Sequence, residues 1–343
     1  MKKRVGRIVS VVAFLVLFCI LFLRVSEIFR AKTSNASDMV HTFYDIEEDT
    51  LDVLCLGSSH AYYGFQPNVL WNEYGITSCV LGSPQQTAAL SYYLLKEALQ
   101  YQKPEVVLFE SYYLWFDQLY TKEERLRQAM DPMRFGTVKM EMVDELLGDL
   151  SWKEKFNYYV PFMTYHQRWQ ELENSDFHSK PYLKGSFMRA NVHSMEDLGV
   201  AREAVEIPET SLEYLNKMVE LCENEGIRFI MFCTPFGVID SEEGYWEKQG
   251  VVLAVEEYAK EKNIPFFFFQ KTGEAGISLT EDLCDTGHLN VYGAEKCTKT
   301  IGQYLSQELG LKSHKGEIGY ESWDADYTLY LKDLEEMIAK QEE

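Results

Sequence analysis

The feature that most constrains this chain is a series of short apolar segments, each followed by a glycine or a polar turn and separated by stretches with helical spacing. The first covers residues 51–56, is rich in strand-forming residues and stops at Gly57. Such a run is typical of a parallel strand that is buried on both faces. We expect further strands over residues 76–81, 105–110, 228–233 and 264–269.

Helical spacing of apolar residues lies between these segments, over residues 67–74, 85–101, 209–225, 245–262 and 292–309. Strands that alternate with helices through short connections form parallel sheets with helices packed on them. The sequence therefore predicts an α/β fold with a doubly wound parallel sheet of roughly five strands.

The alternation breaks between residues 111 and 208, which predicts a large, mostly helical insertion after the third strand. Phe, Tyr and Trp make up sixteen of the eighty residues from 111 to 190, a fifth, against 14% of the whole chain. That density suits a lid facing a sugar. It also suits a second hydrophobic core, which is the interpretation we favour.

Residues 8–23 are the best candidate for a membrane span, because these sixteen residues carry no charge and follow a basic N-terminus. A bilayer core needs about 20 helical residues, so the span would extend through Arg24 and Val25. Seven basic residues and one Glu give residues 1–32 a net charge of +6. The whole chain has a net charge of −21, so the remaining residues carry −27. Positive charge before the span predicts a cytoplasmic N-terminus and a domain outside the cell membrane.

A cleaved signal peptide is the alternative, with small residues for cleavage at Ser34-Asn35-Ala36. The charged spacer over residues 24–32 favours an uncleaved anchor instead. We therefore expect a basic tip and anchor (1–32), a linker (33–50), an extracytoplasmic domain (51–310) and an acidic helical tail (311–343).

The strongly acidic outer part argues against nucleic acid as a partner, because binding to nucleic acid needs clustered Lys and Arg. The histidines and cysteines have no spacing typical of a metal site, and we expect no cofactor.

The residue types of a hydrolytic triad follow strands that should end at one edge of the sheet. Ser58 and Ser59 come directly after the first strand, and Asp285 and His288 precede the last helix of the sheet. A triad needs a nucleophilic hydroxyl, an imidazole base and a carboxylate that orients the imidazole. Ser58 and Asp282 are the alternatives, but a spacing of three residues lets Asp285 reach back to the imidazole.

These blocks resemble the SGNH, or GDSL-like, hydrolase superfamily: Gly57-Ser58-Ser59 after the first strand, Gly82 after the second and Asp285-x-x-His288 before the last helix. The resemblance implies a three-layer SGNH-like fold. It also implies that Ser59 is the nucleophile, His288 its base and Asp285 the orienting acid, with the amides of Ser59 and Gly82 as oxyanion donors.

The chain departs from this family in two places. Ser58 replaces the usual aspartate of the first block, and the third block would fall on residues 110–113, which contain no asparagine. One missing oxyanion donor costs on the order of 3 kcal/mol in the barrier. Tyr112 or Ser111 is our candidate replacement.

The Gly-Ser-Ser variant, joined to one anchor and an outward domain, looks like the branch that contains the D-alanyl transfer protein of teichoic acid modification and the alginate O-acetylation proteins. The likeness covers residues 50–110 and 226–309. It implies work on a cell-envelope polysaccharide beside a multispanning membrane-bound O-acyltransferase.

Three further polar residues could have a role at the site: His60, His166 and Arg168. His166 and Arg168 are candidates for substrate binding, because the sequence around them resembles this branch. The alternative is that they form a hydrogen-bonded pair that stabilises the insertion. His60 should point away from Ser59 and take no part in catalysis.

The sequence thus predicts a membrane-anchored serine O-acyltransferase or esterase that acts on acetyl or D-alanyl esters of an envelope polysaccharide. The alternative is a non-catalytic envelope protein that keeps the fold and binds the polymer or an acyltransferase partner.

Overall fold

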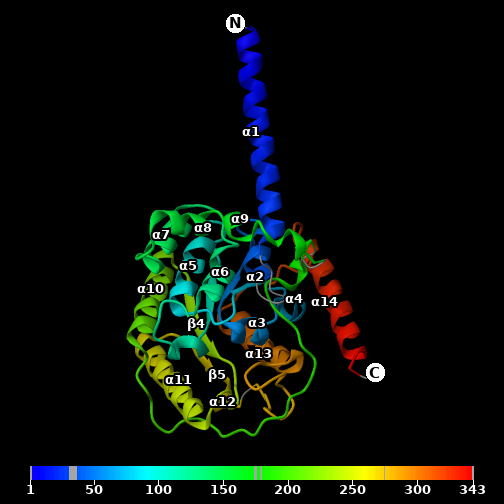
Figure 1. Ribbon diagram of the computed structural model, residues 1–343. Coiled ribbons are helices and arrows are strands. Elements are labelled where there is room, and N and C mark those ends of the chain that lie inside the picture. Colours follow the sequence, from blue (N-terminus) through cyan, green and yellow to red (C-terminus); the bar gives the residue numbers. More distant parts are fainter. Residues whose placement is uncertain (1, 31–36, 174–175, 178–179, 274, 342–343) are drawn as a thin grey trace.

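The computed structural model describes residues 2–30, 37–173, 176–177, 180–273 and 275–341 (Figure 1). The alternative cleavage site at residues 34–36 and the start of the expected linker lie outside the described residues.

A five-stranded parallel sheet forms the centre of the domain, with strand order β2-β1-β3-β4-β5. The predicted α/β fold with a five-stranded parallel sheet is therefore confirmed. The strands are β1 (Val53–Gly57), β2 (Ser78–Gly82), β3 (Val106–Glu110), β4 (Arg228–Cys233) and β5 (Phe266–Phe268).

Helices cover both faces of this sheet because successive strand side chains point to opposite sides. Leu54 and Leu56 of β1 belong to one core with α5 (Ala88–Ala98), α10 (Glu209–Glu225) and α11 (Glu242–Lys262). Val53 and Cys55 belong to the other, with α3 (Ser59–Gly64), α4 (Pro67–Tyr74) and α13 (Val291–Gln303).

Local signals fix the ends of two helices. Pro67 occupies the first turn of α4, where its missing amide costs nothing, and Gly75 ends the helix at φ 69°. Gly226 ends α10 in the same left-handed conformation, at φ 71°. Both helices have the predicted bounds.

The last strand is shorter than predicted. Only Phe266–Phe268 form β5, and Phe269 begins a short helix, α12 (Phe269–Thr272). Phe266 and Phe267 are also partly exposed, because β5 is an edge strand rather than one covered on both faces.

Residues 111–208 form helices that pack on the same core as the sheet. Leu126 and Met142 lie in one hydrophobic cluster with Leu54, so the second core that we favoured from the sequence is wrong for these helices. The helices are α6 (Glu123–Met130), α7 (Thr137–Leu146), α8 (Trp152–Tyr159) and α9 (Phe162–Tyr165). Short 3-10 turns are η2 (Tyr112–Trp115), η3 (Arg168–Gln170) and η5 (Pro181–Leu183), and residues 186–208 contain neither helix nor strand.

Helices also lie at both ends of the chain. α1 (Lys2–Phe29) is long and apolar enough to cross a membrane, and it projects from the domain with its apolar side chains exposed (Figure 1). Short helical turns follow it, α2 (Ser37–Thr42) and η1 (Phe43–Asp45). The tail forms α14 (Glu321–Ala339), as its spacing predicted, and Trp71 Nε1 of α4 donates to its Asp324 Oδ1 at 2.9 Å.

Candidate active site

The turn between β1 and α3 gives its two serines different environments. Gly57 adopts φ 149°, and a Cβ there would lie 2.8 Å from the Cβ of Glu110, so the turn needs glycine. The side chain of Ser58 is fully buried and caps α3 by accepting from the amide of His60 at 3.4 Å. Ser59 is the first residue of α3, and its hydroxyl is left to contact other groups.

A tight loop before α13 holds Asp285 and His288 together. The amide of Cys284 donates to the carbonyl of His288 at 2.9 Å and closes the loop. Asp285 Oδ1 accepts from the amides of Gly287 and His288, both at 2.9 Å. The carboxylate is therefore turned back toward the imidazole three residues later.

Ser59, His288 and Asp285 form one hydrogen-bonded chain. The hydroxyl of Ser59 lies 2.6 Å from His288 Nε2, and His288 Nδ1 lies 2.9 and 3.0 Å from the two oxygens of Asp285. With the imidazole protonated on Nδ1, the ring donates to Asp285 and accepts from Ser59. This is the geometry in which a histidine can take a proton from a serine.

Asp285 is held in its ionised form. Burial alone would raise its pKa, but the hydrogen bond and charge of His288 and the two backbone amides together lower the pKa well below its usual range. Asp282, the alternative acid, is buried elsewhere: it accepts from Lys296 Nζ at 2.7 Å and from the amide of Ser278 at 2.6 Å.

Two aromatic neighbours of His288 were not predicted from the sequence. Tyr63 of α3 lies 4.6 Å from it and His60 lies 4.9 Å from it, measured between ring centroids. His60 therefore lies beside the candidate base, and because its ring makes no hydrogen bond to Ser59 among the described residues, its orientation away from Ser59 stays a prediction. Its ring stacks on Tyr112 at 3.7 Å, and its Nδ1 lies 3.0 Å from Thr234 Oγ1. Burial and the nearby His288 place the pKa of His60 well below its ordinary value, so its ring is neutral.

A buried carboxyl that could not be singled out from the sequence lies at the end of β3, next to Gly57. Glu110, at the end of β3, accepts from the amide of Tyr112 at 3.2 Å, and its Oε2 has no hydrogen-bond partner among the described residues. Burial raises its pKa to about 8, although the amide bond lowers it in part. The side chain is therefore mainly protonated at neutral pH.

The predicted oxyanion donors differ in their surroundings. Gly82 pairs with Gly57 at the ends of neighbouring strands, and a Cβ at position 82 would lie 3.3 Å from the Tyr62 ring. The amide of Tyr112 is committed to Glu110, and the hydroxyl of Ser111 donates to the Phe232 carbonyl at 3.1 Å. The amide of Ser111 donates to the same carbonyl at 2.8 Å, so both donors of Ser111 and the amide of Tyr112 are already engaged.

The two predicted substrate-binding residues lie beside α1, and neither contacts the triad within the part of the chain that the structure describes. Arg168 Nη1 donates to the carbonyls of Phe29 and Arg30, at 2.7 and 2.8 Å, and its Nη2 lies 3.2 Å from Asp176. His166 Nδ1 lies 2.9 Å from the carbonyl of Met163 in α9. Among the described residues these contacts hold the chain around the base of α1, so the structure does not bring the pair to Ser59.

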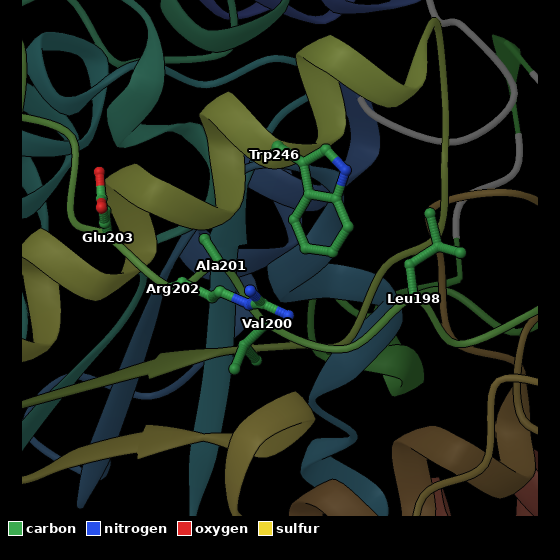
Figure 2. Close-up of a pocket in the computed structure, with 6 residues that line it drawn as sticks. All are labelled: Leu198, Val200, Ala201, Arg202, Glu203 and Trp246. Carbon is green, nitrogen blue, oxygen red and sulfur yellow. The ribbon is translucent and has the colours of Figure 1, made fainter.

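A pocket outside the triad is lined by Trp246 and by residues 198 and 200–203. Figure 2 shows Trp246 of α11 and the irregular segment that carries Leu198, Val200, Ala201, Arg202 and Glu203 around it. Leu198, Val200 and Trp246 pack against the same hydrophobic cluster as Tyr112. The pocket therefore shares a hydrophobic cluster with Tyr112, whose ring stacks on His60.

No protein-family model matches the chain, and comparison with curated proteins found no match either.

Proposed function

We propose that this protein is a membrane-anchored serine O-acyltransferase or esterase of the SGNH type that acts on acetyl or D-alanyl esters of a cell-envelope polysaccharide. The observation that most supports it is the hydrogen-bonded chain from Ser59 through His288 to the ionised Asp285. The apolar helix α1 supports an anchor in the cell membrane. The domain is placed on the outer side because basic residues precede the uncharged segment.

In this mechanism Ser59 Oγ attacks the acyl carbonyl while His288 Nε2 takes its proton. Asp285 fixes the tautomer of His288 and stabilises the imidazolium. The amides of Ser59 and Gly82 would hold the negative oxygen of the tetrahedral intermediate. His288 then returns the proton to the leaving alcohol, and the acyl group remains on Ser59 as an ester.

The second half reverses these roles. A sugar hydroxyl, or water in an esterase, loses its proton to His288 and attacks the acyl ester, and Ser59 leaves with that proton. A transferase would receive its acyl group from a donor such as a multispanning membrane-bound O-acyltransferase.

The test is the acyl-ester content of envelope polysaccharide in the native host with the chromosomal gene changed to Ser59→Ala or Asp285→Asn. We expect a change in ester content with both variants, a loss for a transferase and a gain for an esterase. Ser58→Ala is the matched control and should leave ester content as in the wild type. Unaltered ester content in Ser59→Ala, with protein at normal abundance, would favour the non-catalytic alternative.

A further inference from the structure

The exposed Phe, Trp and Met side chains of the domain gather in one part of the chain. Outside α1, every exposed Phe, Trp or Met among the described side chains lies between residues 135 and 177. Trp152 is 72% exposed, Phe135 67% and Trp169 64%. Large apolar side chains so strongly exposed in one region mark a surface that contacts something else.

Five of these residues form what we call the interfacial patch: Phe135, Trp152, Phe156, Met163 and Trp169. Trp152 and Phe156 are four residues apart in α8 and share one face of that helix. The Phe135 ring contacts Tyr159 at the end of α8, with centroids 5.9 Å apart. In Figure 1, α7, α8 and α9 lie together at the end of the domain from which α1 projects.

Direct contacts between α9 and α1 fix the position of this patch relative to any bilayer that α1 crosses. The ring of Phe162 in α9 lies 5.2 Å from Phe22 and 5.6 Å from Phe29, measured between centroids. Phe22 belongs to the uncharged segment 8–23, and Arg24 follows it. Any bilayer that contains the uncharged segment therefore ends beside α9. The headgroup region, which Trp and Phe side chains favour, would lie at this level.

The charges beside the patch favour lipid over a polyanion. A cleft between α1 and the domain is lined by nearly equal numbers of bases and acids: Arg24, Arg30, Arg134, Lys139, Glu27, Asp45 and Asp131. An anionic polymer would need a clear excess of bases. Exposed Trp and Phe next to balanced charges instead suit apolar insertion at the membrane surface.

We propose that the interfacial patch inserts into the headgroup and upper acyl region of the same bilayer that α1 crosses, so that the domain lies on the membrane in one fixed orientation. The proposal rests on the membrane anchoring in the proposed function, but not on any catalytic role of Ser59.

The test uses tryptophan fluorescence of the full chain in nanodiscs of phosphatidylcholine with brominated or ordinary acyl chains, because bromine quenches indoles that lie in the bilayer. α1 contains no Trp, so the anchor itself gives no signal. Trp152→Phe/Trp169→Phe removes the two indoles of the patch and keeps an aromatic ring at each position. Trp246→Phe, in α11, is the matched control.

We expect brominated lipid to lower the emission of the wild type and of Trp246→Phe, and at least half of that quenching to disappear in Trp152→Phe/Trp169→Phe. Equal quenching in the double variant would overturn the proposal. So would a wild type that brominated lipid does not quench, a result that would leave the patch to a protein partner. Inactive Ser59→Ala should be quenched like the wild type, which separates this test from that of the proposed function.

Discussion

At the residue scale, the environment of each carboxylate near the site decides its task. Asp285 is ionised and oriented toward His288, Asp282 is buried against Lys296, and Glu110 is buried and mainly protonated. In the sequence, Asp285 and Asp282 differ only in their distance from His288. In the structure, the three acids differ in their hydrogen-bond partners and in their burial.

Asp285→Asn should lower the rate of acyl-ester hydrolysis or transfer by about 10³- to 10⁴-fold, because an amide cannot hold His288 in the productive tautomer. Asp282→Asn is the comparison: it removes the charge that Lys296 contacts and should cost about 2 kcal/mol of stability while changing the rate less than tenfold. Rates with a chromogenic acyl ester and thermal unfolding of both variants check this. Similar rates for the two variants would mean that Asp285 does not orient the base.

Glu110 makes the stability of the domain depend on pH. Its folded-state pKa of about 8 exceeds the ordinary value of 4.5, so between these values the folded chain keeps a proton that the unfolded chain has lost. The free energy of unfolding should therefore fall as the pH rises across this window. Glu110→Gln removes the titration, and its stability relative to the wild type should rise by on the order of 3 kcal/mol between pH 5 and pH 8.5. Chemical unfolding at the two pH values measures the difference, and an unchanged difference would show that Glu110 titrates normally.

At the element scale, the ends of α4 and α10 could be predicted because proline and glycine signals fix them locally. The end of the last strand could not, since an unbroken run of phenylalanines has no periodicity that separates a strand from a helix. The end of the helix predicted over residues 292–309 could not be predicted either. α13 ends at Gln303, and a π-helical turn, Tyr304–Glu308, continues it.

The junction of α1 with the domain depends on Arg168, for which the sequence left two roles open, substrate binding and stabilisation of the insertion. Its guanidinium bridges the last carbonyls of the helix to the buried Asp176. Arg168→Ala should cost about 2 kcal/mol of stability and should speed tryptic cleavage after Arg30, whose side chain is only 2% exposed.

Timed tryptic digestion of the full chain in detergent checks this prediction. Arg189→Ala is the control, because Arg189 is exposed, lies near Tyr63 and makes no ion pair among the described residues. Cleavage after Arg30 at the wild-type rate in Arg168→Ala would mean that the guanidinium does not hold this junction.

At the scale of the whole molecule, the parallel sheet and the meeting of Ser59 with His288 could be predicted, because parallel strands end at one edge whatever their separation in sequence. The neighbours that complete the site could not. His60 is an ordinary residue of a helix start, and only packing brings its ring beside His288. The aromatic residues of 111–190 have the composition of a core, but Phe135, Trp152 and Trp169 are strongly exposed.

The most direct test of the account is to label the purified full chain with a serine-directed fluorophosphonate and to map the adduct by mass spectrometry. We predict one adduct on Ser59, none in Ser59→Ala, and labelling of Ser58→Ala at its usual stoichiometry, with a stability loss of about 1 kcal/mol from the missing helix cap. Labelling that survives in Ser59→Ala, or an adduct on another residue of the wild type, would contradict the proposed mechanism.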